Sequence, residues 1–217
     1  MMDWTDNSGE IILQHLNRLQ NTNQLMIADA KTGNVRTILT EKDAAWVDVT
    51  MPAMEWTDDG KSFLWLSERD GWRRVYKVSR DGSSVKAVSG EGFDVEEIAS
   101  IDETNGWLYF IASPENATQR YLYRTRLDGS GKAEKITPES SKGWNSYNIS
   151  PNSRWAVHTF SSFDTPPRYS FVDLSGNKVL RTMVDNAGLK SRLGGIKKGA
   201  HEFFRIDTGN GVTLDGW

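Results

Sequence analysis

The chain has 217 residues, no cysteine, and a formal net charge of -3 from 26 basic and 29 acidic side chains. The lack of cysteine excludes disulfide frameworks, thiolate metal sites and a cysteine nucleophile. Because basic and acidic residues are interspersed, neither nucleic acid nor an anionic membrane surface is an expected partner, and no run approaches the roughly 20 apolar residues of a membrane span.

Strands joined by tight turns are most evident between residues 55 and 82. Asp59-Gly60 and Asp81-Gly82 supply the positive φ angles that hairpin turns require, and the runs around them are aromatic and β-branched. This stretch therefore predicts three β-strands and two turns. The nine Trp, six Tyr and eight Phe of the whole chain also suit short twisted strands better than long helices.

The same pattern occurs four times, and we expect the copies at residues 2–42, 54–90, 94–138 and 144–183. Two turn positions mark the repeat: one series is Gly9, Gly60, Gly106 and Ser153, and the other is Gly33, Gly82, Gly129 and Gly176. Successive members of either series lie 46 to 51 residues apart. A period near this value with four strands per unit is typical of β-propeller blades. The sequence thus predicts an all-β fold, with a β-propeller fragment of about four four-stranded blades in residues 1–183.

Residues 184–217 depart from the repeat. The segment 184–193 predicts a short helix that is capped by Asp185 or Asn186 and ended by Gly194-Gly195. Two apolar runs on either side of residues 207–211 predict a hairpin. We expect this helix and hairpin to lead into a further domain, and we expect the first residues, which echo residues 54–60, to lie already inside the fold.

Candidate catalytic and metal-binding residues do not form a recognisable centre. His15, His158 and His201 lack metal-ligand spacing, so we interpret them as ordinary strand histidines. The nucleophile elbow Gly-x-Ser-x-Gly does not occur; residues 128–132 have too few residues between their glycines, since Ser130 alone separates Gly129 from Gly131. We therefore expect no catalytic Ser/His/Asp site within this chain.

Acidic and aromatic residues also favour structural interpretations. Glu96 and Glu97 would diverge, because successive side chains of a strand point to opposite faces. Asp58-Asp59 and residues 68–70 lie at turns and lack the spacing of a calcium loop. Aromatic residues that recur with the repeat predict packing between blades: Trp56, Trp65, Trp107, Tyr123, Trp155 and Tyr169. The sequence thus predicts no catalytic residue, no metal ligand and no cofactor.

Several segments carry a family resemblance. Residues 55–60 (Glu-Trp-Thr-Asp-Asp-Gly) and 67–76, which begin Ser-Glu-Arg-Asp-Gly, resemble the propeller region of the dipeptidyl peptidase IV family within the prolyl oligopeptidase group. Further segments agree in order, namely residues 16–21 (Leu-Asn-Arg-Leu-Gln-Asn), 106–110, 121–123 and 184–186. The segment 67–71 is fairly specific, whereas the Asp-Gly turns are generic.

The resemblance covers nearly the whole chain and implies the second half of an eight-bladed propeller. In that family the catalytic Ser, Asp and His belong to a C-terminal α/β-hydrolase domain, which would begin beyond Trp217, so none is assigned here. The paired glutamates that bind the substrate's amino terminus belong to an earlier blade, and the context of Glu96-Glu97 does not match them. Because vertebrate members carry cysteines in these blades, the cysteine-free chain implies a bacterial relative, with a periplasmic or secreted parent.

Three hypotheses follow. The first is a non-catalytic propeller portion of a serine exopeptidase that releases Xaa-Pro or Xaa-Ala dipeptides, with a peptide substrate, the missing blades and the hydrolase domain as partners. The second is a stand-alone propeller-type module that binds a protein or glycan. The third, a complete small hydrolase, is disfavoured by the missing elbow. Half of a ring would leave two blade faces bare, so the first hypothesis also predicts self-association.

Overall fold

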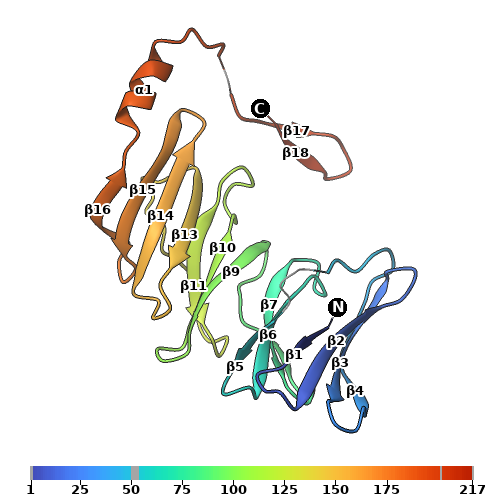
Figure 1. Cartoon of the computed structure of the whole chain (residues 1–217). Helices are drawn as coiled ribbons and strands as arrows, with labels where there is room; N and C mark the ends of the chain where they lie inside the picture. Colours follow the sequence, from blue (N-terminus) through green and yellow to red (C-terminus); the bar gives the residue numbers. More distant parts are fainter. Residues whose placement is uncertain (1, 50–53, 201, 217) are drawn as a thin grey trace. The chain divides into compact units, whose positions relative to one another are not determined.

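The computed structural model describes residues 2–49, 54–200 and 202–216. Four four-stranded antiparallel sheets follow one another along the chain, and a helix and a two-stranded hairpin come after them (Figure 1). Within each sheet, strands that are consecutive in sequence are neighbours. The all-β prediction is confirmed, as is the prediction of a short helix and hairpin at the C-terminal end.

The strands have the following bounds. The first sheet contains β1 (Met2–Trp4), β2 (Glu10–Leu16), β3 (Thr22–Asp29) and β4 (Val35–Lys42). The second contains β5 (Glu55–Thr57), β6 (Ser62–Ser67), β7 (Arg74–Ser79) and β8 (Val85–Ala87). The third contains β9 (Val95–Asp102), β10 (Trp107–Ala112), β11 (Tyr121–Arg126) and β12 (Glu134–Lys135). The fourth contains β13 (Trp144–Ile149), β14 (Trp155–Ser162), β15 (Thr165–Asp173) and β16 (Lys178–Val184).

The chain divides into two compact units. Unit 1 comprises Met1–Phe110 and Arg124–Glu134, and unit 2 comprises Ile111–Tyr123 and Lys135–Trp217. Strands of the third sheet are thus shared between the units. The first two sheets belong to unit 1, and the fourth sheet, the helix and the hairpin belong to unit 2.

The core of unit 1 joins the first and second sheets. Its buried members are Ile12, Leu25, Ile27, Ile38, Leu39, Phe63, Trp65, Tyr76 and Val78. Each such side chain contributes about 1.5–3 kcal/mol when it is fully buried. The turn at Gly82 approaches β4 so closely that an added Cβ would lie 2.1 Å from the carbonyl oxygen of Ile38. With its φ of +77°, this position requires glycine, which lets the Asp-Gly turn of the second sheet contact the first.

The second strands of the sheets differ in burial. In β6 and β10 both faces are buried, in keeping with their continuous apolar runs; Phe63 and Leu64, for example, are adjacent and both fully buried. In β2 and β14 burial alternates instead. One face of the first sheet and one face of the fourth are therefore partly open to solvent, which the sequence pattern alone did not reveal.

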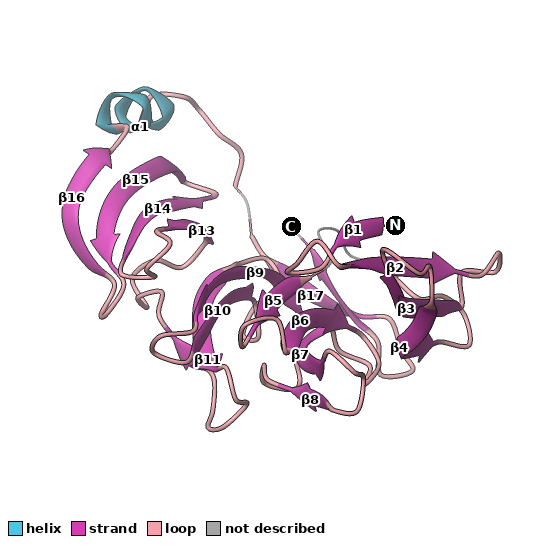
Figure 2. Cartoon of the chain, turned by 60° about the horizontal axis from the view of Figure 1, so that its bottom comes forward, coloured by secondary structure: helices cyan, strands magenta, loops and turns pink. Residues whose placement is uncertain are grey.

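The helix α1 (Ala187–Gly194) follows β16 directly and is the one helix among the described residues (Figure 2). A carboxylate oxygen of Asp185 accepts a hydrogen bond from the Ala187 amide at 3.0 Å, whereas Asn186, with φ of +53°, makes no side-chain cap bond. Of the two predicted caps, Asp185 supplies the bond. Among the residues that the structure describes, no helix is long and apolar enough to cross a membrane.

The hairpin pairs β17 (Phe204–Asp207) with β18 (Thr213–Gly216). Its two faces differ in chemistry, because Phe204, Ile206 and Leu214 alternate with Arg205 and Asp215. The last two form an ion pair of 2.7 Å.

Candidate functional site

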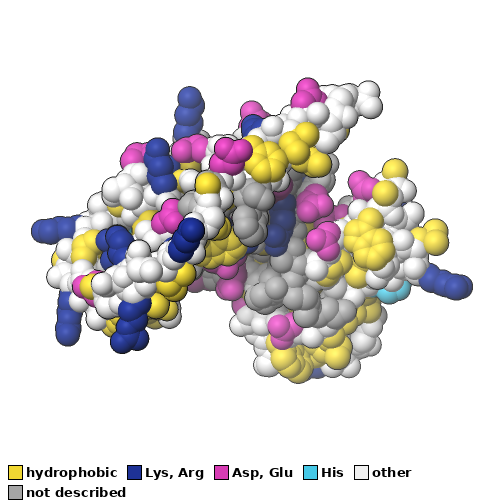
Figure 3. Space-filling model, turned by 90° about the horizontal axis from the view of Figure 1, so that it is seen from above, with side chains coloured by type: hydrophobic (Ala, Val, Ile, Leu, Met, Phe, Trp, Pro, Cys, Tyr) yellow, Lys and Arg dark blue, Asp and Glu magenta, His cyan; other side chains and the backbone are white. Residues whose placement is uncertain are grey.

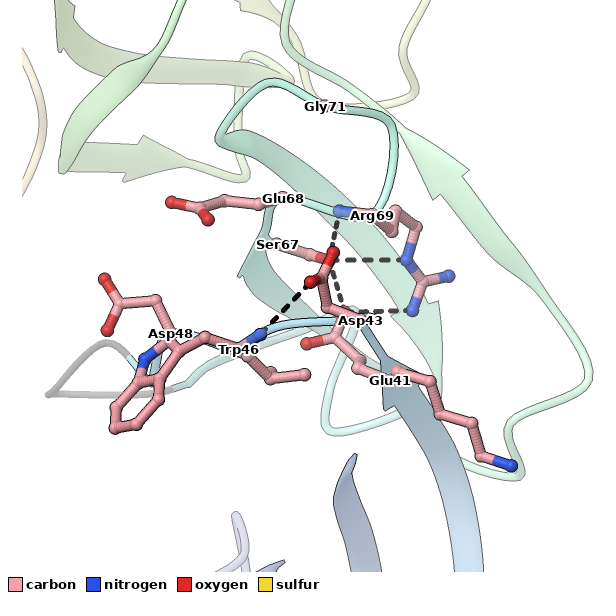
Figure 4. Close-up of a pocket in the computed structure, with 10 residues that line it drawn as sticks. Glu41, Asp43, Trp46, Asp48, Ser67, Glu68, Arg69 and Gly71 are labelled. Atoms are coloured by element: carbon pink, nitrogen blue, oxygen red, sulfur yellow. Dashed lines mark hydrogen bonds and ion pairs between the residues drawn. The ribbon is translucent and has the colours of Figure 1, made fainter. Parts of the chain in front are cut away.

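A cavity of about 250 Å³ opens in unit 1 where the end of β4 meets the loop that follows β6 (Figure 4). It is lined by residues 41–43, 46–48, 67–69 and Gly71. The loop side is the segment Ser-Glu-Arg-Asp-Gly, the most specific element of the family resemblance. We define this cavity and its lining as the loop pocket.

A buried carboxylate forms the inner wall of the loop pocket. Glu41, the penultimate residue of β4, is 7% exposed; it accepts hydrogen bonds from the Ser67 hydroxyl and from Arg69 Nη2, the latter at 3.1 Å. The Arg69 amide in turn donates to Ser67 Oγ at 3.2 Å. Figure 4 shows these three side chains converging. Because a buried carboxylate is costly unless it is paired, the loop and β4 fix one another.

The outer wall is the segment 43–48, which a local turn and the first sheet hold in place. The Asp43 carboxylate accepts hydrogen bonds from the amides of Ala45 at 2.7 Å and Trp46 at 3.1 Å. This turn presents the Trp46 side chain with 56% of its surface exposed. These backbone bonds also hold the pKa of the Asp43 carboxyl below its usual range.

The segment 16–21, which also carries the resemblance, supports the same wall. The carbonyls of Gln20 and Asn21 accept the amides of Val47 at 2.8 Å and Asp43 at 3.1 Å. The two segments 16–21 and 67–71, which both carry the resemblance, therefore both hold residues 41–48 through hydrogen bonds.

The loop 67–71 is anchored at its other end by Tyr76. The Tyr76 hydroxyl donates to Asp70 Oδ2 at 2.6 Å, and Arg74 pairs with the same oxygen at 3.2 Å. Burial and the Asp70 carboxylate raise the pKa of Tyr76 to about 12. At neutral pH Tyr76 is thus a fixed hydrogen-bond donor. The Arg69 guanidinium lies 5.1 Å from the centre of its ring, which adds a cation–π contact.

The chemistry of the loop pocket suits binding. Its lining offers carboxylates, a guanidinium group and an indole, and the Ser67 hydroxyl donates a hydrogen bond to the Glu41 carboxylate, which also accepts one from Arg69. Within residues 2–49, 54–200 and 202–216, no group of three His, Cys, Asp or Glu side chains is placed to hold a metal ion.

The histidines considered from sequence are separate from this pocket. His15 is exposed on β2 and His158 is buried on β14, so the two occupy the second strands of different sheets, as the repeat predicts. His201 lies outside the described residues.

The acidic pairs are likewise apart from it. Glu96 is half-buried and Glu97 is exposed in the strand β9. Asp58 forms an ion pair of 2.7 Å with Lys77, which lowers the pKa of its carboxyl, and its φ of +55° marks a turn residue.

Sequence reasoning missed Glu41, Asp43 and Trp46. The only local signal for Glu41 was its position two residues after Leu39, on the buried side of β4, since an acid that continues a buried strand requires a partner. That partner, Ser67, is 26 residues away.

Replacing Glu41 by alanine should lower the free energy of unfolding by about 1.5–3 kcal/mol, because the Ser67 hydroxyl and the Arg69 guanidinium lose a charged acceptor. Urea denaturation measures this. The matched control is Glu68→Ala, which removes an exposed carboxylate of the same loop and should stay within about 0.5 kcal/mol of the original chain. Equal effects of the two substitutions would show that the Glu41 network does not stabilise the pocket.

Comparison with known proteins gives evidence on the family that is independent of the structure. The family model of the dipeptidyl peptidase IV (DPP IV) N-terminal region matches residues 1–167. A probable dipeptidyl peptidase 4 of Aspergillus flavus is 22% identical over 219 residues, covering 97% of this chain and 28% of that protein. A probable dipeptidyl-aminopeptidase B of Emericella nidulans is 27% identical over 225 residues, covering 96% and 24%.

Solved structures agree in fold. The crystal structure of Porphyromonas gingivalis dipeptidyl peptidase 4 superimposes with a TM-score of 0.87 at 27% identity, covering 99% of this chain and 30% of that one. A putative dipeptidyl aminopeptidase IV of Bacteroides ovatus gives 0.73 at 18% identity, covering 85% and 28%, and supports the fold alone. This chain spans about a quarter of the length of the relatives it matches. It belongs to the dipeptidyl peptidase IV N-terminal region family.

Proposed function

We propose that this chain is the non-catalytic propeller portion of a serine exopeptidase of the dipeptidyl peptidase IV type, and that its loops shape the access of peptides to a catalytic domain. The observation that carries the proposal is the convergence of segments 16–21 and 67–71 on residues 41–48. Both segments carry the family resemblance, and their contacts hold in place a loop that exposes Trp46. The parent enzyme would release Xaa-Pro or Xaa-Ala dipeptides from peptide amino termini.

The proposed partners are the remaining blades and the hydrolase domain of the longer protein. Exposed apolar side chains support this. The strand β16 is exposed along its whole length and carries Val179, Leu180, Met183 and Val184, and β1 exposes Met2 and Trp4. In the face of the molecule that Figure 3 shows, apolar side chains lie at the surface between charged ones. Such surfaces are rarely left uncovered in monomers, so without those partners copies of this chain should associate. The alternative is a stand-alone module that binds a protein or glycan.

The purified chain should show no turnover of a chromogenic Gly-Pro substrate, and its sedimentation coefficient should rise with concentration. A full-length relative of this family is the positive control for the assay. Robust turnover by the purified chain would exclude the non-catalytic assignment. A monomer at all concentrations that melts cooperatively would instead favour the stand-alone module.

A further inference from the structure

The chain contains two Asn-Gly dipeptides, Asn105-Gly106 and Asn210-Gly211. An asparagine that precedes glycine is prone to lose its side-chain amide, because the glycine nitrogen can attack the side-chain carbonyl carbon and glycine has no Cβ to hinder the approach. The attack requires a backbone that can bend toward the side chain. The fold therefore decides which of two chemically identical dipeptides reacts.

Asn210-Gly211 lies in the turn that joins β17 to β18 (Figure 1). Both residues are exposed, and their φ angles are +54° and +75°. The turn is closed by the Thr208 amide, which donates to the Val212 carbonyl at 2.9 Å. Among the residues that the structure describes, no hydrogen bond holds the Asn210 side chain or the Gly211 amide. The reacting groups are therefore positioned only by the turn itself.

The hairpin that carries Asn210 receives little support from packing. It has two strands, and residues 202–215 are exposed throughout. A two-stranded hairpin is marginally stable, and an exposed segment of this kind opens locally at a small cost in free energy. Local opening allows the Gly211 nitrogen to reach the Asn210 side chain.

Asn105-Gly106, in the turn between β9 and β10, is held much more firmly. Asn105 Nδ2 donates to Asp102 Oδ2 at 2.8 Å, and the Asn105 amide donates to Asp102 Oδ1 at 3.0 Å. The Asn105 carbonyl accepts a hydrogen bond from Arg126 Nη1 at 3.1 Å, and the Gly106 carbonyl accepts one from the Leu127 amide at 2.9 Å. This turn also belongs to a four-stranded sheet whose strand β10 is largely buried. Both residues of this dipeptide are thus fixed.

We propose that Asn210 is a modification site, at which the side-chain amide is converted without an enzyme to aspartate or isoaspartate, with water as the co-reactant. The Gly211 nitrogen forms a bond to Asn210 Cγ and gives up its proton, the Cγ–Nδ2 bond breaks, and ammonia leaves. Water then opens the resulting five-membered succinimide at either carbonyl carbon. No electron is transferred, and the inference is independent of the proposed function.

The modified turn differs in charge and in backbone length. Either product places a new carboxylate near Asp207, whose side chain accepts the Gly209 amide at 2.8 Å. Isoaspartate also adds one carbon atom to the backbone inside the segment that the bond between Thr208 and Val212 closes. Both changes should weaken the pairing of β17 with β18.

Incubation of the full chain at pH 8 and 37 °C, followed by peptide mapping with mass spectrometry, tests this directly. We expect the peptide that contains Asn210 to gain one dalton and to split into two chromatographic forms, at a rate at least about fivefold that of the peptide that contains Asn105. In urea, where neither turn is held, the two rates should agree within about twofold. Hydroxylamine cleaves a chain at the succinimide, so it should cut the folded chain after Asn210 and the unfolded chain at both sites.

Two variants complete the test. Asn210→Gln should abolish the mass gain at this position, because glutamine would have to form a larger ring. Asp102→Ala removes the acceptor that holds Asn105, and it should raise the rate at Asn105 while leaving the rate at Asn210 unchanged. Equal rates at the two sites in the folded chain, or an Asn210 that reacts in urea but not in the folded chain, would overturn the proposal. Because the readout is a mass change at one peptide, these results do not depend on the turnover and sedimentation experiments that test the proposed function.

Discussion

Replacing Leu25 by alanine should lower the free energy of unfolding by about 2–5 kcal/mol, which is a large part of the stability of a typical domain. Leu25 lies in the middle of β3 and is fully buried, opposite Gln14 of β2 and Leu39 of β4. Truncation removes its apolar contacts and leaves a cavity in the core that joins the first two sheets.

Leu19 provides the control for this substitution. It lies six residues earlier in the same sheet's β2–β3 turn and is 71% exposed. Leu19→Ala should change the free energy of unfolding by no more than about 0.5 kcal/mol. Guanidinium or urea denaturation of both variants measures the difference. Similar small effects at both positions would mean that the first and second sheets do not share a packed core.

Acidification from about pH 6.5 to pH 4 should destabilise unit 2 through His158. This side chain is 5% exposed, stacks on Tyr147 at 4.3 Å, and has the Arg168 cation nearby. Burial, with a smaller contribution from Arg168, lowers the pKa of His158 to about 4. Between the two pKa values the unfolded chain binds a proton that the folded chain does not, so stability falls as pH falls. The full difference corresponds to about 3 kcal/mol, reached near pH 4.

The substitution His158→Gln should remove this pH dependence, because glutamine keeps a donor for Asn145 Oδ1 but does not titrate. His15, exposed on the corresponding strand β2, is the matched control, and His15→Gln should leave the pH profile unchanged. Denaturation curves between pH 4 and pH 7.5 give the comparison. If His158→Gln retained the full slope, groups other than His158 would account for the acid sensitivity.

The repeat was predictable because its determinants are local. A turn such as Asp59-Gly60 needs positive φ at both residues, and the structure has +52° and +76° there. Residues on either side of such a turn pair directly, so alternating turns and apolar runs predict the strands. The end of the helix at Gly194 followed from equally local rules, although the choice between Asp185 and Asn186 as the cap depended on the actual backbone angles.

The loop pocket was not predictable in this way. Glu41 acquires its role from Ser67 and Arg69, which lie 26 and 28 residues further along the chain. No local pattern encodes which polar atoms will pair across such a distance. The burial of the second strands also depended on the packed structure: it is continuous in β6 and β10 but alternates in β2 and β14, because burial depends on whether another sheet covers the strand.

By itself, then, the sequence determined the all-β architecture and the four sheets, because short-range turn chemistry and a regular period specify them, and it indicated the family through the resemblance carried by segments such as 67–71. The tertiary structure alone decided that segments 16–21 and 67–71 hold one loop, that Glu41 is buried and paired, and that His158 is shielded from solvent while His15 is not. The physical reason is that burial and hydrogen-bond partners are properties of packed surfaces, which residues distant in sequence form together.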